Sequence, residues 1–434
     1  MQHVHPVQVP LQGDAVLDQV QQGELALPAG SVDVRAPVRG VVVALPVAVG
    51  DHVTPGTELV IIESMKMEHV ARAPVAGTVV EVPVAEGDDV DEGAVVVVLV
   101  GSVSQSDTDD SGPTADPAHV RPDLAEVHDR IHCTRDEGRV EVVAKRHAKG
   151  RLTARESVAG LLDPDTFLEY GALAIAAQRQ RRDVGELITR TPADGLLTGT
   201  GRVHGMPVAV MAYDYTVLAG TQGLHNHRKT DRLLGLARRE CLPVIVFAEG
   251  GGGRPGDTDT SAVAQLDVPT FRLLADLSRT VPTLALVSGY CFAGNAALAG
   301  TCDTIIATEG SSLGMGGPAM IEGGGLGRFA PGEVGPMDIQ VANGVVDRLV
   351  RDDTAAIADA RRYLHFLAAP RLAAGSVADQ RHLRHLVPEN RLRAYPIRPV
   401  LEGLFDSDSV FELRRGFGAG IVTALARLDG RTVG

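Results

Sequence analysis

The feature that most constrains the fold is an internal repeat near the start of the chain. Residues 36–60 align with residues 73–97 at a shift of 37 residues, and 14 of the 25 aligned positions are identical. Both copies consist of valine-rich runs interrupted by Gly and Pro at matching places, which predicts short strands joined by tight turns rather than helices. Two similar copies in tandem predict a domain with two-fold pseudosymmetry.

The two copies are connected by residues 63–69, which read Glu-Ser-Met-Lys-Met-Glu-His. A connection between two related half-sheets is normally a surface turn, and a lysine is costly to bury. We therefore expect the amine of Lys66 to project into water at a hairpin tip. An amine in that position is open to covalent modification, although an unmodified surface lysine would satisfy the same pattern.

Residues 32–100 resemble a biotinyl carrier domain, an all-β flattened barrel in which a ligase attaches biotin to the lysine of a Met-Lys-Met turn. Met65, Lys66 and Met67 match that turn. The related lipoyl carriers usually have an acidic residue before the lysine, so the resemblance favours biotin, bound covalently to Lys66. It also implies a biotin protein ligase as a partner.

The composition limits what the whole chain can be. A length of 434 residues predicts about three domains, and a net charge of -14 argues against a nucleic-acid partner. No apolar run is long enough to cross a membrane. The four cysteines form no CxxC pair, which predicts neither a metal site nor a disulfide framework and suits a reducing cytoplasm. We expect residues 1–31 to be a mobile arm, and the polar composition of residues 101–120 predicts a flexible linker.

The rest of the chain has the pattern of an α/β domain over residues 121–385. It predicts helices at 122–148, 225–239 and 354–367 and a hairpin at 196–213. Short apolar strands at 242–248 and 283–287 each run into a glycine-rich loop, at 249–254 and 288–294, and each loop is expected to lead into a helix, the first near Thr260. Backbone N–H groups at such positions stabilise negative charge, although tight turns alone would explain the glycines.

Three segments of this domain resemble the carboxyltransferase part of biotin-dependent acyl-CoA carboxylases, which has a crotonase-like fold. Residues 149–156, Lys-Gly-Arg-Leu-Thr-Ala-Arg-Glu, resemble its entry, and the two glycine loops resemble those that cradle an acyl-CoA enolate. The resemblance implies that Gly251, Gly252, Ala293 and Gly294 carry the catalysis. The sequence departs from the family motifs where Gly250, Gly253, Phe292 and Asn295 replace Ser, Ala, Thr and Gly.

The resemblance further implies an acyl-CoA substrate, whose phosphates require basic side chains. Arg228, Lys229 and Arg254 are the candidates, although a solvated helix face would also explain Arg228 and Lys229. Cys291 lies in the second loop without an evident histidine partner, and we expect it to be a buried structural thiol rather than a nucleophile.

Residues 386–434 resemble only the opening of the family's second half, so most of that half is missing from the resemblance. The implied function is to carry carboxybiotin on Lys66 and transfer its carboxyl group to the α-carbon of an acyl-CoA, with a separate biotin carboxylase and in a homo-oligomer. A biotin-dependent decarboxylase or transcarboxylase subunit is an alternative. A non-catalytic biotinylated carrier or assembly subunit is another, and the acyl chain length stays open.

Overall fold

The computed structural model describes residues 30–101, 116, 118–259, 268–368, 372, 373 and 375–434. These residues belong to two compact units, Met1–His119 and Val120–Gly434, which we describe separately. The expected N-terminal arm and linker lie almost entirely outside the described residues. So does the helix start expected near Thr260.

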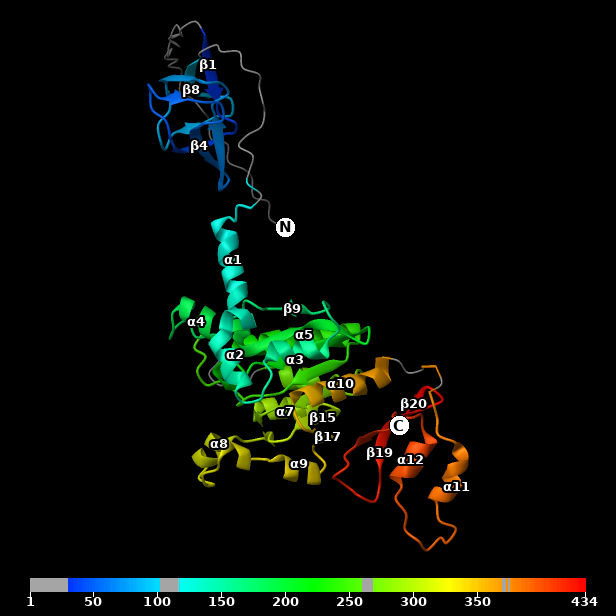
Figure 1. The fold of residues 1–434 in the computed structure, drawn as a ribbon. Coiled ribbons are helices and arrows are strands. Elements are labelled where there is room, and N and C mark those ends of the chain that lie inside the picture. Colours follow the sequence, from blue (N-terminus) through cyan, green and yellow to red (C-terminus); the bar gives the residue numbers. More distant parts are fainter. Residues whose placement is uncertain (1–29, 102–115, 117, 260–267, 369–371, 374) are drawn as a thin grey trace, which may run out of the picture. The chain divides into compact units, whose positions relative to one another are not determined.

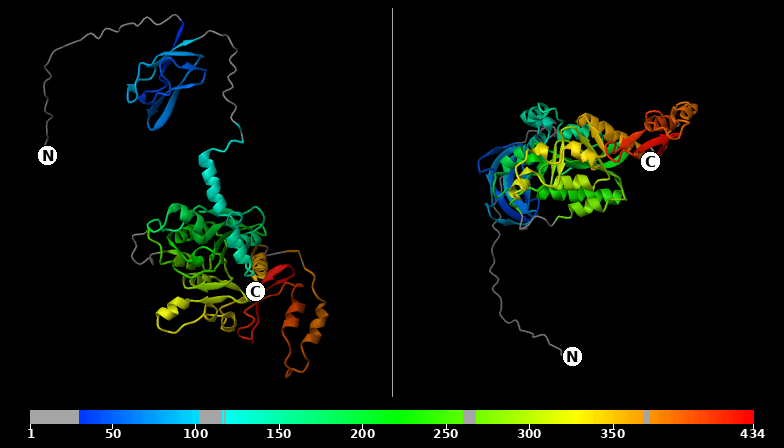
Figure 2. Two further views of the ribbon diagram at one scale, coloured as in Figure 1. Left: turned by 60° about the vertical axis from the view of Figure 1, so that its left-hand side comes forward. Right: turned by 90° about the horizontal axis from the view of Figure 1, so that it is seen from below.

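The first unit is built from short strands (Figures 1 and 2). Its strands are β1 (Ser31–Arg35), β2 (Gly40–Ala44), β3 (His52–Val53), β4 (Glu58–Ser64), β5 (Met67–Arg72), β6 (Gly77–Glu81), β7 (Asp89–Val90) and β8 (Val95–Gly101). They form two four-stranded sheets, with strand orders β1-β8-β6-β3 and β5-β4-β2-β7. One apolar cluster, which includes Leu59, Ile62, Val96 and Leu99, fills the space between them.

The sequence repeat is visible in the hydrogen bonds of this unit. Adding 37 to the residue numbers takes β1, β2, β3 and β4 onto β5, β6, β7 and β8, so each sheet maps onto the other. The N–H of Gly50 donates to the Val79 oxygen, and the equivalent N–H of Gly87 donates to the Val42 oxygen, both at 2.8 Å. The predicted two-fold pseudosymmetry is therefore confirmed.

Two equivalent glycines allow the strands to approach closely. A Cβ at Gly40 would lie 2.3 Å from the carbonyl oxygen of Glu63, and a Cβ at Gly77 would lie 2.5 Å from that of Val100. No side chain fits at such distances unless the backbone moves. Gly101, which pairs with Gly77 across the sheet, has only ordinary contacts, the nearest at 3.7 Å.

The second unit is organised around a seven-stranded sheet of order β17-β15-β13-β12-β11-β10-β9. Strands β11, β12, β13, β15 and β17 are parallel, and β10 forms the expected antiparallel hairpin with β11 around His204 and Gly205. The bounds are β9 (Leu168–Tyr170), β10 (Leu196–Val203), β11 (Met206–Tyr213), β12 (Val244–Phe247), β13 (Thr283–Val287), β15 (Thr304–Thr308) and β17 (Arg348–Val350). A separate parallel pair joins β14 (Tyr290–Phe292) to β16 (Ser312–Gly314).

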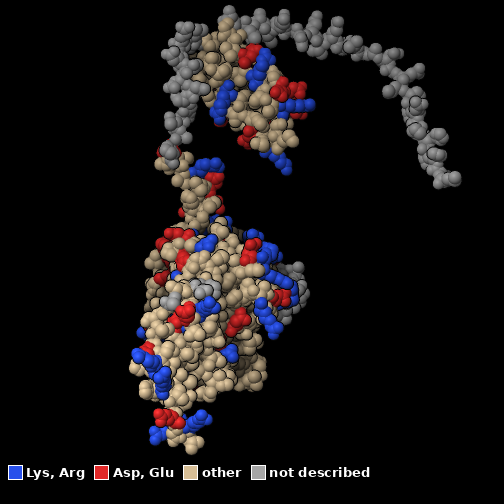
Figure 3. All heavy atoms as spheres, turned by 90° about the vertical axis from the view of Figure 1, so that its right-hand side faces the viewer, with Lys and Arg blue, Asp and Glu red and all other residues tan. Residues whose placement is uncertain are grey.

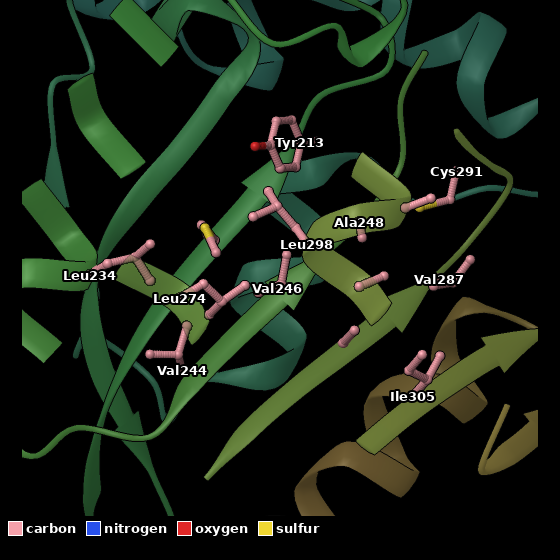
Figure 4. Close-up of a cluster of buried hydrophobic side chains, with 14 of the residues drawn as sticks. Tyr213, Leu234, Val244, Val246, Ala248, Leu274, Val287, Cys291, Leu298 and Ile305 are labelled. Carbon is pink, nitrogen blue, oxygen red and sulfur yellow. The ribbon is translucent and has the colours of Figure 1, made fainter. Parts of the chain in front are cut away.

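Helices cover both faces of this sheet. Along β12 the side chains alternate, so Val244 and Val246 pack under α5, α6 and α7, whereas Ile245 and Phe247 pack under α3 and α10. Figure 4 shows the first of these two clusters. The helices are α1 (Pro122–Cys133), α2 (Val140–His147), α3 (Ala154–Leu161), α4 (Val184–Arg190), α5 (Leu224–Glu240), α6 (Thr270–Ala275), α7 (Gly294–Thr301), α8 (Pro318–Gly323), α9 (Met337–Ala342) and α10 (Asp353–Ala368).

The helices expected at 225–239 and 354–367 are confirmed as α5 and α10. The expected helix at 122–148 is instead broken into α1 and α2 by a 3-10 turn, Asp136–Arg139. After α10 follow α11 (Leu383–Leu386), α12 (Arg398–Leu404) and a small antiparallel sheet of β18 (Phe411–Leu413), β19 (Thr423–Leu428) and β20 (Arg431–Val433). Among the described residues, no helix has the length and apolarity needed to cross a bilayer.

The glycine contacts in the first unit give a test of its pseudosymmetry. We expect G40A and G77A to destabilise this unit by similar amounts, about 1–3 kcal/mol each, because each forces the backbone away from a facing carbonyl. G101A should cost much less. Chemical denaturation of the full chain, with limited proteolysis as the readout for the first unit, measures these changes in stability. Unequal effects of G40A and G77A, or a G101A effect as large as theirs, would contradict the equivalence.

Candidate active site

Lys66 lies in a two-residue turn between β4 and β5. Ser64 pairs with Met67 at the end of the hairpin, and Met65 and Lys66 both have positive φ, 51° and 67°. These values fit the twist that tight hairpins favour, although non-glycine residues adopt them at some cost. The side chains of Met65 and Met67 are 95% and 65% exposed. The turn therefore presents the Lys66 amine to water, as the repeat predicts.

In the second unit, the two glycine loops follow the carboxyl ends of neighbouring parallel strands, β12 and β13. They are tied together by a short bridge: the N–H of Gly250 donates to the Tyr290 oxygen at 2.8 Å, and the N–H of Phe292 donates to the Gly250 oxygen at 2.9 Å. The carboxyl edge of a parallel sheet is where such folds usually bind ligands. The resemblance of both loops to those that cradle an acyl-CoA enolate implies this meeting.

The backbone donors differ from those expected. The N–H groups of Gly251, Gly252 and Ala293 donate inside the fold, to the Ala219 oxygen at 3.1 Å, the Asn295 Oδ1 at 2.9 Å and the Gly314 oxygen at 3.0 Å. Three of the four predicted donors are thus already paired, which corrects the expectation for them. Loop sequences do not encode such pairings, because the acceptors come from segments distant in the chain.

Two other N–H groups remain open. Within the described part of the chain, the N–H groups of Gly253 and Gly294 make no hydrogen bond. The two loops touch here: a Cβ on Gly252 would lie 2.5 Å from the Cβ of Ala293 and 3.3 Å from the nitrogen of Gly294. Gly294 begins α7, whose preceding residue provides no side-chain cap, so the helix dipole adds positive potential at this point. The arrangement suits an oxygen that acquires negative charge.

The loops rest on two strained turns. Residues 193–195 and 218–220 each form a run of three residues with positive φ, between 48° and 71°. Four of these six residues are not glycine, and each such residue costs about 1–3 kcal/mol unless its surroundings hold it in place. The second turn contacts the first loop directly, because the Ala219 oxygen accepts the N–H of Gly251. Strain of this kind is concentrated at functional sites.

Arg254 holds the first turn and does not face solvent. Its side chain is 4% exposed, and its guanidinium lies 2.5 Å from the Asp194 carboxylate and 3.5 Å from that of Asp257. It also donates to the Thr221 oxygen at 2.8 Å. The expectation that Arg254 contacts substrate phosphates is therefore wrong, because its donors are used within the fold.

Lys229 is similarly turned inward. Its ammonium donates to the Ala193 oxygen at 2.8 Å and to the Leu196 oxygen, the two ends of the first strained turn. Burial lowers the pKa of this amine to about 8. The expected phosphate contact is wrong for Lys229 as well. Arg228, the preceding residue on α5, is exposed as expected.

Sequence reasoning missed a second group of exposed cations. Arg179 and Arg181 are exposed, and Arg181 donates to the oxygen of Gly256, two residues beyond the first glycine loop. The run Arg-Gln-Arg-Arg at 179–182 was the available signal. Acidic and basic side chains are interspersed on the face of this unit drawn in Figure 3.

Two buried groups beneath the loops are structural. Cys291 is 0% exposed and packs in the cluster of Figure 4, where burial raises the pKa of its thiol, as expected for a structural cysteine. Glu249, at the start of the first loop, lies 2.5 Å from the Arg146 guanidinium, and both side chains are nearly buried. This ion pair, which the sequence did not reveal, ties α2 to the first loop.

Comparison with known proteins agrees with this architecture. The carboxyl transferase domain family matches residues 145–434, and the biotin-requiring enzyme family matches residues 24–99. Two curated relatives cover 72% of this chain. One is a biotin-dependent long chain acyl-coenzyme A carboxylase beta4 subunit of Mycobacterium tuberculosis, 30% identical. The other is a methylmalonyl-CoA carboxyltransferase 12S subunit of Propionibacterium freudenreichii, 31% identical.

Solved structures give the same result. A single-chain, multi-domain long-chain acyl-CoA carboxylase has a TM-score of 0.69 and 49% identity, over 94% of this chain and 39% of that one. A transcarboxylase 12S hexamer with hydrolysed methylmalonyl-coenzyme A has a TM-score of 0.62 and 28% identity, over 72% of this chain and 60% of that one. The chain spans about 60% of the length of the two curated relatives.

A comparison of Arg254 with Arg228 tests whether Arg254 supports the fold from inside. We expect R254M to destabilise the second unit by about 3–5 kcal/mol, because it leaves Asp194 buried without its counter-ion. R228M, which removes an exposed guanidinium from the neighbouring helix, should change stability by less than about 0.5 kcal/mol. Denaturant unfolding measures both. A stable R254M variant would mean that Arg254 is not the internal support described above.

Proposed function

Because this chain belongs to the carboxyl transferase family and has a biotin-requiring domain before the transferase domain, we propose that it uses biotin on Lys66 to transfer a carboxyl group to the α-carbon of an acyl-CoA. The observation that carries this proposal is the contact between the two glycine loops at Gly252 and Ala293. Each loop also has an N–H without a hydrogen bond among the described residues, on Gly253 and on Gly294. The layered sheet with its two glycine loops fits a crotonase-like fold. The proposed domains are residues 32–100, 121–385 and 386–434.

The turn at Lys66 fits a biotinyl group. Amide formation needs an accessible amine on a turn that a ligase can enclose, and the exposed Met65 and Met67 flank it without covering it. When attached, the biotinyl group supplies the activated carboxyl group and a nitrogen that accepts the α-proton. The protein then has to position the substrate and stabilise its charge.

Removal of the α-proton shifts negative charge onto the thioester oxygen. We assign the donors for this oxygen to the N–H groups of Gly253 and Gly294. Of the four residues expected from the sequence, this keeps Gly294 and replaces Gly251, Gly252 and Ala293. Each preorganised donor contributes on the order of 3 kcal/mol to lowering the barrier. Both residues are at least partly exposed, so a substrate can reach them. A Cβ at Gly294 would lie 2.0 Å from the Gln222 Oε1, so a side chain there requires the Gln222 side chain to move.

The phosphates of CoA need cationic side chains near the two glycine loops. Arg228 is exposed on the first turns of α5, and Arg179 and Arg181 are exposed beside the segment that follows the first loop. We propose these three residues as the phosphate contacts. They replace Lys229 and Arg254 in this role.

The partners follow from the proposed reaction. Biotin must be attached by a biotin protein ligase and carboxylated by a biotin carboxylase, which we place on a separate subunit. We also propose that the chain works in a homo-oligomer, because the similar transcarboxylase 12S structure is a hexamer. One relative is named a long chain acyl-coenzyme A carboxylase subunit, and others are named propionyl-CoA carboxylase beta chains, so acyl-CoA esters of either length are candidate substrates.

A transcarboxylase is the second candidate, favoured by the similarity to the methylmalonyl-CoA carboxyltransferase subunit. Such an enzyme takes its carboxyl group from another carboxylated metabolite and needs neither ATP nor a biotin carboxylase. Dependence of transfer on ATP therefore separates the two.

The carrier assignment predicts a single modification. The full chain, produced together with a biotin protein ligase, should gain the mass of one biotinyl group, located by peptide mass spectrometry on Lys66. K66R should gain none, because the guanidinium does not form the amide. Biotin on another lysine, or its persistence in K66R, would refute the assignment.

The donor assignment predicts a difference between two substitutions at one position. Solvent deuterium should enter the α-carbon of propionyl-CoA in the presence of the biotinylated chain. G253P removes the N–H and should slow this exchange by about 100-fold, whereas G253A keeps the N–H and should stay within about threefold of wild type. The Cβ of either variant enters open space. Equal rates in the two variants, with both folded by thermal unfolding, would exclude Gly253 as a donor.

A further inference from the structure

Asn295, the second residue of α7, links three segments of the candidate active site. Its side chain is 0% exposed. Its Oδ1 accepts the N–H of Gly252 at 2.9 Å, and its Nδ2 lies 3.3 Å from the oxygen of Gly220. The amide therefore joins the second loop to the first loop and to the strained turn at residues 218–220.

The amide has no freedom to turn around. A Cβ at Gly250 would lie 2.6 Å from Asn295 Nδ2, so the first loop closes over the side chain. Rotation by 180° would set an NH2 group against the N–H of Gly252 and an oxygen against the oxygen of Gly220. Both buried hydrogen bonds would become repulsive contacts, and unpaired buried polar groups are costly.

This contact has a consequence for the first loop. With its N–H bonded to Asn295, Gly252 directs its donor inward, whereas the next residue, Gly253, has an N–H that makes no hydrogen bond among the described residues. The family motif that the second loop resembles has glycine at position 295. A glycine there would have no side chain to accept the N–H of Gly252.

We propose that Asn295 is a positioning residue that withholds the N–H of Gly252 from the substrate and fixes Gly253 and Gly294 as the donor pair for the thioester oxygen. The proposal rests on the proposed function for its catalytic meaning, but the coupling of the three segments is a separate claim. A merely structural asparagine would support the fold without setting which donors face the substrate.

N295D gives the sharpest test because a neutral carboxyl group closely matches the shape of the amide. When protonated, it can accept the N–H of Gly252 and donate its own O–H to the Gly220 oxygen. When ionised, it repels both that oxygen and the charge forming on the thioester. Burial raises the pKa of such a carboxyl, so the variant is competent below this pKa and loses activity as pH rises through it.

The measured quantity is the rate of α-deuterium exchange into propionyl-CoA between about pH 5.5 and 9, in the biotinylated full chain. N295D should stay within about threefold of wild type at the acid end and fall at least about tenfold below it at the alkaline end. The Michaelis constant should change little. The adjoining segments carry other titratable or charged groups, namely Glu249, Arg254, Tyr290 and Cys291. These groups are the same in wild type and variant, so the comparison of the two pH profiles isolates the effect of residue 295. T301V, which removes the hydroxyl bond to Ala297 on the same helix, serves as the control and should follow that profile.

A second readout does not depend on catalysis. Amide hydrogen exchange of the peptide covering residues 249–253 should be at least about tenfold faster in N295A than in wild type, and unchanged in T301V. If wild type exchanges no α-deuterium, the proposed function fails while this readout still decides the coupling. If wild type is active and N295D has the same pH profile and N295A the same amide exchange, the proposal is overturned.

Discussion

The site depends on how closely two backbones can approach. At Gly252 the first glycine loop meets the second with only 2.5 Å between the position of a missing Cβ and the Cβ of Ala293, and Gly252 has a φ of 88° that favours glycine. This approach joins two loops that each have an N–H without a hydrogen bond among the described residues, on Gly253 and on Gly294. A side chain at Gly252 would separate them, because the facing atoms belong to backbone and to a short, fixed methyl group.

Buried charged side chains and one buried side-chain amide support this contact between the two loops. Arg254 and Lys229 hold the turn at residues 193–195, Asn295 and Ala219 tie the turn at residues 218–220 to the first loop, and Glu249 anchors the start of that loop to Arg146. Such groups are expensive to bury. They are consistent with a fold that holds strained turns in place so that the donors are rigid before substrate arrives.

The sequence predicted the repeat, the exposed lysine turn and the order of strands and loops, because these features are encoded locally by valine periodicity, glycine spacing and a duplicated segment. It did not predict which N–H groups stay open, since the acceptors at Ala219, Asn295 and Gly314 are distant in the chain. Nor did it separate Arg228 from Lys229. Adjacent residues on a helix point in different directions, and here one reaches solvent and the other reaches two buried carbonyl oxygens.

The most direct test of the account is a crystal structure of the chain with propionyl-CoA bound. The thioester oxygen should lie about 2.7–3.1 Å from the nitrogens of both Gly253 and Gly294. It should not contact the nitrogen of Gly252, which should remain bonded to Asn295. A thioester bound at Gly251 and Gly252, or one that contacts neither loop, would contradict the assignment of this site as the place where the carboxyl group is received.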